Sequence, residues 1–296
     1  MLKNPELFSL TERVNARLHK TLCKVAEFIY KLSAKRLEKS DFLFTQLKNN
    51  GVPLEKRGKF IAAYPTINNV KLEVLLKRKA SDPFVYRQVL FSQEYSSIVR
   101  FFQQNNLALN SIVDAGANIG LTTLYFKAHF PEALVIALEP NANTFKRLTT
   151  NLDLNKTSNT TTLEKGLWKS DCILNGNYSF RDHQDWSYCL QETSANKRGN
   201  VECISVDSLL NQCGLDEIDL FKIDIEGSED ALFENEEAVE NWLPKVKIVA
   251  AEVHEEFNCS DRIESILRKF NFNIEHVGEL TVGVNQAFFK NKALPR

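Results

Sequence analysis

The apolar residues near the start of the chain recur at steps of three and four, the spacing that places them on one face of an α-helix. This stripe consists of Leu18, Leu22, Val25, Phe28, Ile29 and Leu32. The pattern predicts a helix over residues 5–48, and the Asn-Asn-Gly-Val-Pro run at 49–53 ends it. Residues 71–76 then have the composition of a short strand.

A second helical segment is predicted for residues 81–102. Ser81 or Asp82 can cap its first turn, and Pro83 suits the first helical positions, where its missing N–H leaves no hydrogen bond unmade. We place a boundary at residue 80, with a basic helical N-terminal extension before it and the main domain, residues 81–296, after it.

From residue 111 onward, strand-like and helix-like segments alternate. The predicted strands cover residues 112–115, 133–140, 160–164, 201–206, 218–227 and 246–254. The predicted helices cover residues 120–130, 141–155, 208–212, 228–239 and 261–270. Residues 272–278 and 284–290 close the chain as a hairpin. Strands separated by helices indicate an α/β fold with a parallel sheet and right-handed crossovers, and the hairpin adds an antiparallel edge.

The composition is that of an ordinary globular protein, with 296 residues, 43% of them apolar and 25% charged. No run approaches the ~18 apolar residues of a membrane span, and the first residues lack the basic-then-apolar pattern of a secretory signal. The cysteines form no C-x-x-C pair, which favours free thiols in a reducing cytoplasm over disulfides or a zinc site. They are Cys23, Cys172, Cys189, Cys203, Cys213 and Cys259.

Charge is distributed unevenly along the chain. Residues 1–80 contain 17 Lys and Arg against 7 Asp and Glu, and the remaining residues contain 20 against 31. A basic segment suits nucleic acid, phosphates, anionic lipid or a protein partner. Because no aromatic-plus-basic repeat accompanies it, we expect no nucleic-acid partner. We favour docking on the acidic domain of the same chain or of a neighbouring subunit, so a homo-oligomer or a partner bound through the N-terminal helices stays open.

The turn after the first core strand has the spacing of a nucleotide-binding loop. It reads Asp114-Ala-Gly116-Ala117-Asn118-Ile-Gly120. It lacks the middle glycine that lets a dinucleotide pyrophosphate approach the backbone, and no Lys-Ser/Thr pair makes it a P-loop. A ligand without phosphates fits better, and S-adenosylmethionine (SAM) is the expected cofactor. Asp114 would meet its ammonium directly or through water, and N–H groups of the turn would meet its carboxylate.

The next predicted strand ends in Glu139, where a carboxylate can accept charge-assisted hydrogen bonds from both ribose hydroxyls. Asn141 is expected either to cap the following helix or to contact the adenosine. Leu167, after the third strand, is expected to pack near the adenine. An NAD site and a tight turn without a ligand are the alternatives for this loop.

Several segments in this order resemble the FkbM family of SAM-dependent methyltransferases. They are SDPFVYRQVLFSQEY, DAGANIG, LEPN, FKIDIEGSE and AEVH. The resemblance covers roughly residues 81–290, and KIDIEGSE is its most specific part. It implies a class I methyltransferase fold, which is Rossmann-like, with a seven-stranded sheet whose last strand is antiparallel. It also implies methyl transfer to oxygen, often to a sugar hydroxyl of a glycan, glycolipid or natural product.

Methyl transfer from a sulfonium is an in-line displacement, so the enzyme must align the acceptor oxygen and often remove its proton. Asp224 and Glu226 end one predicted strand, and the alternation of a strand places both on the same side. They are predicted to face the methyl group or to bind the acceptor. The alternative is that they only cap the next helix and pair with Lys222.

Glu252 and His254 share one face at the end of the next strand. His254 is the preferred general base, because neutral imidazole near physiological pH accepts a hydroxyl proton. The expected catalytic residues are thus His254, Asp224 and Glu226. With Glu252, these side chains could instead hold magnesium or manganese. A metal is not favoured, because the sequence does not show that the side chains converge.

The acceptor side is less defined. Residues 175–200 are polar with interleaved aromatic residues, which suit a sugar ring or, equally, an edge hairpin packed on the sheet. The aromatic residues are Tyr178, Phe180, Trp186 and Tyr188. The functional expectation is a cytoplasmic SAM-dependent O-methyltransferase acting on a small-molecule or glycan acceptor. An NAD-dependent oxidoreductase and a non-catalytic protein that binds a partner through its basic arm are the alternatives.

Overall fold

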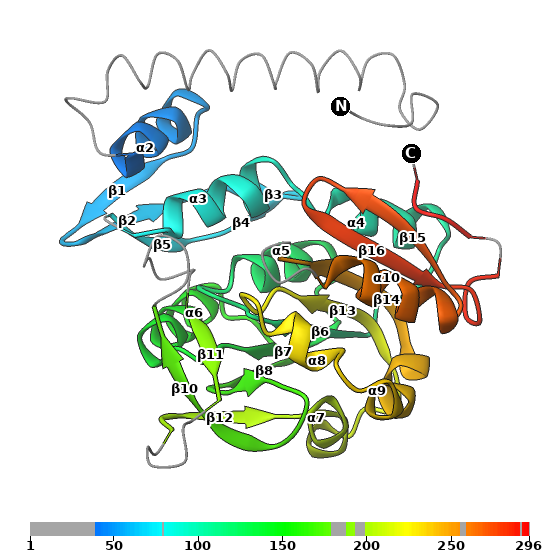
Figure 1. The fold of residues 1–296 in the computed structure, drawn as a ribbon. Helices are drawn as coiled ribbons and strands as arrows, with labels where there is room; N and C mark the ends of the chain where they lie inside the picture. Colours follow the sequence, from blue (N-terminus) through cyan, green and yellow to red (C-terminus); the bar gives the residue numbers. More distant parts are fainter. Residues whose placement is uncertain are drawn as a thin grey trace.

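A seven-stranded sheet forms the centre of the structure, a computed structural model that describes residues 39–78, 80–178, 188–192, 199–254, 259–290 and 292–295 (Figure 1). The strand order is β15-β16-β14-β13-β6-β7-β8. These strands are β6 (Ser111–Ala115), β7 (Leu134–Leu138), β8 (Thr160–Leu163), β13 (Ile218–Ile223), β14 (Val246–Glu252), β15 (Phe272–Val277) and β16 (Leu280–Asn285). Every neighbouring pair is parallel except the two that involve β16. The expected α/β fold class, with its antiparallel terminal hairpin, is confirmed.

Two predicted strands differ from the observed ones. The last strand starts at Leu280 rather than residue 284, because Gly278, at φ 66°, turns the hairpin directly after β15. Residues 201–206 do not enter the central sheet, since β12 (Val201–Ile204) belongs to a four-stranded sheet of order β11-β10-β12-β9. Its other members are β9 (Gly166–Leu167), β10 (Cys172–Asn177) and β11 (Cys189–Gln191). A short apolar run does not by itself reveal which sheet it joins.

Helices cover both faces of the central sheet. They are α4 (Ser96–Gln104), α5 (Leu121–His129), α6 (Ala142–Leu154), α7 (Val206–Cys213), α8 (Glu229–Leu232), α9 (Glu236–Trp242) and α10 (Ser260–Lys269). Successive residues of a strand point to opposite faces of the sheet, so β6 contributes to the apolar core on each face. Ile112 packs in the core that contains residues of α4, α5 and α6, and Val113 packs in the core that contains residues of α7, α9 and α10. The helix predicted for 228–239 is broken, because Asn235 takes an extended backbone and caps α9.

The segment predicted as one helix over residues 81–102 contains three pieces. They are α3 (Asp82–Tyr86), the π-helix η1 (Arg87–Phe91) and α4. Pro83 lies in the first turn as expected, but the Ser81 side chain makes no capping hydrogen bond. Gln93, at φ 49°, lies in the gap before α4 and turns the chain there.

The predicted helical extension is only partly helical in its described part. Helix α2 (Lys39–Asn49) is present, whereas the rest of the helix predicted for residues 5–48 lies outside the described residues. Short strands follow: β1 (Leu54–Arg57), β2 (Phe60–Ala63), β3 (Thr66–Ile67), β4 (Val70–Lys71) and β5 (Val74–Lys77). The missed signal is turn chemistry. Asn68 and Asn69 both have positive φ in the two-residue turn between β3 and β4, as tight hairpins require.

Asn151 of α6 and Asn155, directly after the helix, attach these strands to the rest of the fold. Asn155 accepts from the backbone N–H of Glu73 (2.9 Å) and donates to its carbonyl (2.7 Å). Asn151, fully buried, accepts from the N–H of Leu75 (2.8 Å) and donates to the carbonyl of Ile119 (2.9 Å). The side-chain amides therefore satisfy backbone groups beside β5 that a neighbouring strand would otherwise satisfy.

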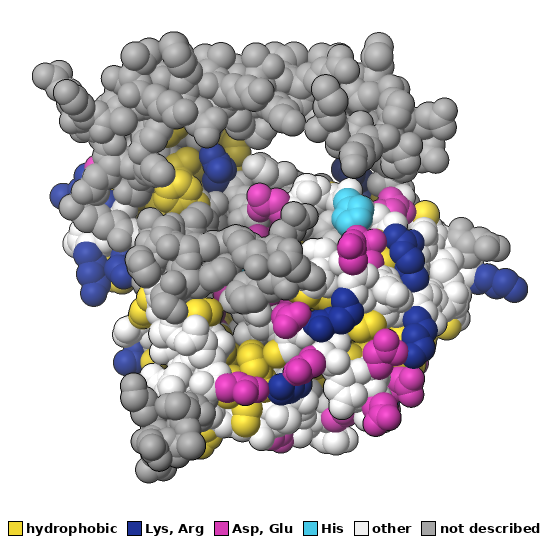
Figure 2. All heavy atoms as spheres, viewed as in Figure 1, with side chains coloured by type: hydrophobic (Ala, Val, Ile, Leu, Met, Phe, Trp, Pro, Cys, Tyr) yellow, Lys and Arg dark blue, Asp and Glu magenta, His cyan; other side chains and the backbone are white. Residues whose placement is uncertain are grey.

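The described surface over α9 and α10 carries interspersed charges of both signs (Figure 2). Arg262 pairs with Asp230 at 2.6 Å, and Lys269 pairs with Glu236. The cysteines among the described residues are all free thiols, as expected. Among the described helices, none combines the length and the apolar character needed to cross a bilayer.

Replacement of Asn151 by alanine is expected to lower the free energy of unfolding by about 1–3 kcal/mol, because it leaves buried backbone groups without partners. Chemical denaturation followed by circular dichroism measures the effect. Asn143→Ala, on an exposed position of the same helix, is the matched control and should change stability much less. Equal effects of the two substitutions would show that the buried amide does not attach the strands.

Candidate active site

The carboxyl ends of β6 and β13 lie side by side at the point in the sheet from which successive strands are added in opposite directions. β7 and β8 continue the sheet beyond β6, and β14 and the hairpin continue it beyond β13. Open α/β sheets bind ligands in the crevice at such a switch point. The two turns that the sequence singled out, at residues 114–120 and 224–229, are therefore neighbours in space.

The two glycines of the first turn have different roles. Gly116 has φ 73°, and a Cβ there would lie 1.7 Å from the carbonyl oxygen of Asp224, so only glycine lets the two turns approach each other. Gly120, at φ 87°, precedes α5, and a Cβ there would lie 2.7 Å from Cδ1 of Leu148. It permits close packing of α5 on α6 and lies outside both cavities described below.

Glu139 lies at the end of β7 and lines a cavity with Gly116, Asn118, Leu167 and other residues, named here the Glu139 cavity. One carboxylate oxygen accepts from the backbone N–H of Asn118 (3.0 Å) and the other from that of Asn141 (2.9 Å). Burial raises the pKa of Glu139 to about 7, although these hydrogen bonds oppose the rise. Each oxygen keeps a free lone pair, so the carboxylate can still accept hydroxyl groups.

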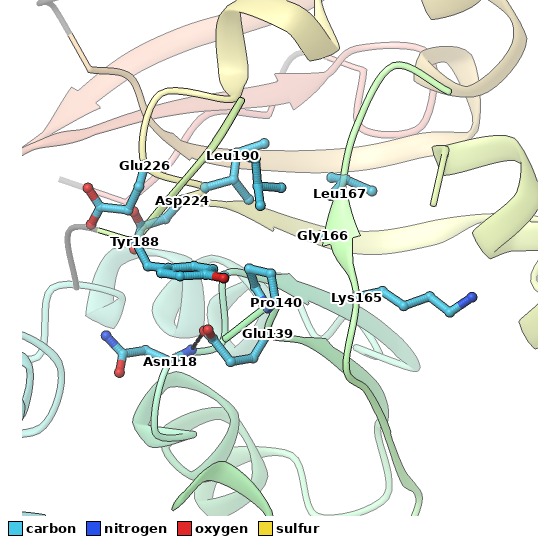
Figure 3. A pocket seen from close by; sticks show the side chains of 12 residues that line it. Asn118, Glu139, Pro140, Lys165, Gly166, Leu167, Tyr188, Leu190, Asp224 and Glu226 are labelled. Carbon is cyan, nitrogen blue, oxygen red and sulfur yellow. Dashed lines mark hydrogen bonds between the residues drawn. The ribbon is translucent and has the colours of Figure 1, made fainter. Parts of the chain in front are cut away.

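The hairpin of β10 and β11 closes one side of the Glu139 cavity. Figure 3 shows the Tyr188 ring beside Glu139 and Pro140, with Leu167 also in the lining and the Lys165 ammonium pointing away. The described parts of residues 175–200 pair as a hairpin at the edge of the four-stranded sheet, and Tyr188, directly before β11, lines the cavity. Phe180 and Trp186 lie outside the described residues.

Asn141 caps α6 rather than lining either cavity. Its side-chain oxygen accepts from the N–H groups of Asn143 (3.0 Å) and Thr144 (3.2 Å). Its amide donates to the hydroxyl of Tyr178 at 2.5 Å, which connects the cap to the β10–β11 hairpin. Of the two roles considered for Asn141, the structure shows the cap.

Asp114 is fully buried and pairs within the protein, so the expected contact with the SAM ammonium is not supported. Its carboxylate accepts from Thr123 Oγ1 (2.7 Å) and lies 3.4 Å from the ammonium of Lys222, the residue opposite it on β13. Lys222 also lies 3.3 Å from Asp224 and donates to the carbonyl of Gly116 (2.7 Å). Burial alone lowers the pKa of Lys222, but Asp224 and Asp114 raise it well above its ordinary value.

A second cavity, of about 310 Å³, adjoins the first and is named here the acidic cavity. It shares Gly116, Asn118, Asp224 and Glu226 with the Glu139 cavity. Further lining residues are Ala117, from the predicted turn, together with Glu94, Tyr95, Lys222, Glu252 and Glu279. Glu94 and Glu279 were not predicted as site residues: Glu94 lies within the segment SDPFVYRQVLFSQEY, whose resemblance assigned it no role, and Glu279 lies in the terminal hairpin, so only the fold brings them to the cavity.

The turn after β13 is held by Glu229, the first residue of α8. The buried Glu229 carboxylate accepts from the N–H groups of Ile225 (2.9 Å) and Gly227 (2.8 Å) and lies 3.2 Å from Nδ1 of His254. Glu226, between the two anchored amides, has φ 51°. A non-glycine residue in this region is strained, and such strain persists only where surrounding contacts enforce it.

His254 does not meet the requirements of the general base expected from the sequence. Its side chain is only 1% exposed, it is not among the residues lining either cavity, and its Nε2 lies 3.5 Å from Glu226. Burial lowers its pKa, but the hydrogen bond to Glu229 and the charges of Glu229, Asp224 and Glu226 raise it to about 9. These contacts favour the protonated ring, which does not accept a proton.

Glu252 has the properties that His254 lacks. It lines the acidic cavity. Burial and the nearby Asp224 raise its pKa to about 8, against the opposite effect of His254. A carboxylate with a pKa near the working pH is a suitable proton acceptor.

The three predicted catalytic residues do converge. Single ligand atoms of Asp224, Glu226 and His254 lie within 4.8 Å of one another, so the group could approach a divalent cation. Asp224, however, already has the ammonium of Lys222 at 3.3 Å, which would repel a second cation.

The fold and the comparisons together define a class I, SAM-dependent methyltransferase. A family model described as "Methyltransferase FkbM domain" matches residues 114–274, more than half of the chain. The chain belongs to the FkbM methyltransferase family.

Several individual proteins are similar to this chain. Methyltransferase sdnD of Sordaria araneosa is 29% identical over 228 residues, which are 66% of this chain and 84% of that protein. Methyltransferase 1 of Beauveria bassiana (strain ARSEF 2860) is 40% identical over 63 residues, 21% of this chain and 25% of that protein. Among solved structures, magnesium protoporphyrin IX methyltransferase from Synechocystis PCC 6803 with bound SAM has a TM-score of 0.37 and 12% identity, covering 66% of this chain and 79% of that chain.

Glu139→Ala is expected to weaken SAM binding about 10- to 100-fold, because hydrogen bonds to a charged group contribute about 1.5–3 kcal/mol. Titration calorimetry measures the affinity, and circular dichroism verifies that the variant remains folded. Glu164→Ala, at an exposed position after the next strand, is the control and should bind SAM normally. An unaltered affinity in the Glu139 variant would remove Glu139 from the cofactor site.

Proposed function

We propose that this protein transfers the methyl group of SAM to a hydroxyl oxygen of a saccharide-containing acceptor, such as a glycan, a glycolipid or a natural product. The observation that carries the proposal is the set of lining residues shared by the two cavities, which includes Gly116 and Asp224. A donor in the Glu139 cavity and an acceptor in the acidic cavity would be adjacent, as an in-line displacement needs.

Bound SAM supplies a methyl group on a positively charged sulfur. Glu139 would accept the ribose hydroxyls, and Leu167, which is buried in the lining, would pack on the adenine. Asp224 and Glu226 line both cavities and would stabilise positive charge at the junction. Asp114 would act indirectly, because it fixes Lys222 and thereby the position of Asp224.

We assign the proton acceptor to Glu252 and a positioning role to His254. Glu252 faces the acidic cavity, whereas His254 lies between Glu226 and the buried Glu229. The protonated ring of His254 can hold Glu226 electrostatically while Glu229 fixes the ring orientation.

The choice of a hydroxyl acceptor is supported by the lining of the acidic cavity. Carboxylates accept hydrogen bonds and offer none when ionised, so they match the O–H groups of a sugar. A cytoplasmic location is part of the proposal and is supported by the free thiols of the described cysteines.

The proposal is tested with methyl-labelled SAM and a panel of glycans, glycolipids and hydroxylated natural products. The expected product carries the label as an ether, which resists mild alkaline hydrolysis, whereas a methyl ester is cleaved. Label found only in alkali-labile or nitrogen-bound form would contradict transfer to a hydroxyl.

Treatment with EDTA is expected to leave the rate of methyl transfer unchanged. Among the described residues, Asp224, Glu226 and His254 are the group that could hold a metal ion, and the ammonium of Lys222 already pairs with Asp224 there. The assay compares the untreated and chelated enzyme at equal SAM. A loss of activity that magnesium or manganese restores would show that the metal alternative is right.

The pH profile distinguishes the two candidate bases. If ionised Glu252 accepts the proton, kcat/KM rises with pH and levels off above about 8, the pKa to which burial and Asp224 raise this group. Glu252→Gln should remove this rise and lower turnover about 10²- to 10⁴-fold. Glu237→Gln, at an exposed site on α9, is the control. Retention of the rise in Glu252→Gln, together with its loss in His254→Gln, would return the role of base to His254.

A further inference from the structure

The acidic cavity contains far more negative than positive charge. Its carboxylates come from four separate parts of the chain, namely the segment after η1, the turn after β13, the end of β14 and the β15–β16 turn. They are Glu94, Asp224, Glu226, Glu252 and Glu279. Lys222 is the single cationic side chain among the described residues of this lining.

These carboxylates oppose one another's ionisation. Burial raises the pKa of Glu94 to about 7, and the charges of Asp224 and Glu279 contribute to the rise. Burial, followed by Asp224, also raises the pKa of Glu252, and Glu279 and Glu94 add to it. Such an arrangement is unfavourable for the isolated protein, and carboxylates held together at this cost in a cavity indicate a functional site.

The protein and the donor do not supply enough positive charge to balance the cavity. The ammonium of Lys222 is already shared between Asp224 and Asp114. SAM adds a net charge of one, because its sulfonium and ammonium are partly offset by its own carboxylate. Even when Lys222, the His254 ring beside Glu226 and the donor are all counted against the five lining acids, two carboxylates remain without a cation once all five are ionised.

The surplus acids lie on the side of the acceptor. Asp224 and Glu226 line both cavities, so the positive charge of the donor falls beside them. Glu94, Glu252 and Glu279 line the acidic cavity but not the Glu139 cavity. With Glu252 assigned to proton transfer, Glu94 and Glu279 remain without a role in the methyl-transfer step itself.

We propose that Glu94 and Glu279 select an acceptor that carries an ammonium group beside the methylated hydroxyl, so that the substrate class is an amine-bearing saccharide rather than a neutral or acidic one. This inference rests on the proposed function, because it assigns the acceptor to the acidic cavity. A cavity of about 310 Å³ is at the small end of ligand sites and suits one sugar ring. An anionic sugar would be repelled by the same carboxylates.

The test compares four monosaccharides that differ in charge. The full chain is first saturated with S-adenosylhomocysteine, and the binding of each monosaccharide is then measured by titration calorimetry at pH 7. The probes are glucosamine, N-acetylglucosamine, glucose and glucuronate. Glucosamine is expected to bind at least 10-fold more tightly than its neutral N-acetyl form. Its binding should also release protons, seen as a dependence of the heat on the buffer, because a bound cation lowers the pKa of Glu94 and Glu252.

The variants Glu94→Gln and Glu279→Gln, and their combination, should reduce the preference for glucosamine, the double variant to less than 2-fold. Glu237→Gln, with the same substitution on the exposed surface of α9, should retain it. Glucosamine binding no tighter than N-acetylglucosamine, including binding of neither, would overturn the inference.

The labelled-methyl assay keeps the two proposals apart. Transfer to neutral saccharides without any charge preference would leave the proposed function standing and reject the ammonium inference. Selective binding of glucosamine, together with transfer only to non-hydroxyl atoms of other acceptors, would support the charge preference and reject the proposed reaction.

Discussion

The buried ammonium of Lys222 is the contact on which the geometry of the site depends. It lies 3.4 Å from Asp114 and 3.3 Å from Asp224 and donates to the carbonyl of Gly116, so it joins the ends of β6 and β13. Removal of one partner from a buried ion pair typically costs about 3–5 kcal/mol, because the other charge is left uncompensated. The two cavities meet at this junction, and their common wall is therefore held by one cation.

A second buried group, Glu229, defines the turn after β13. It accepts two backbone amides and also contacts His254, so it sets both the strained backbone of Glu226 and the orientation of the imidazole. The hydrogen bond and the surrounding carboxylates raise the pKa of the histidine and so favour its protonated form beside Glu226. A carboxylate on the adjacent strand, Glu252, is left with the environment that suits proton transfer.

The carboxylates gathered in the acidic cavity lower the stability of the folded chain, so their placement there does not follow from stability alone. Like charges that are close together and partly desolvated destabilise the folded chain. The scaffold can tolerate this because two large apolar clusters stabilise the opposite faces of the central sheet, and only a few of their members, such as Tyr95 and Leu167, also line a cavity. Function here is concentrated at one edge of the sheet, and stability comes from the layers on either side of it.

The sequence by itself determined the order of strands and helices in the core, the glycine turn, and the acid at the end of β7, because hydrophobic periodicity and turn chemistry are local. It also placed Asp224, Glu226 and His254 at strand ends that do converge. The tertiary structure decided everything that depends on register and burial. Lys222 lies opposite Asp114 only because β13 pairs with β6, and this pairing engages the Asp114 carboxylate within the protein. The pKa of His254 and the nearness of Glu94 and Glu279 follow likewise from contacts between distant segments, which no local pattern encodes.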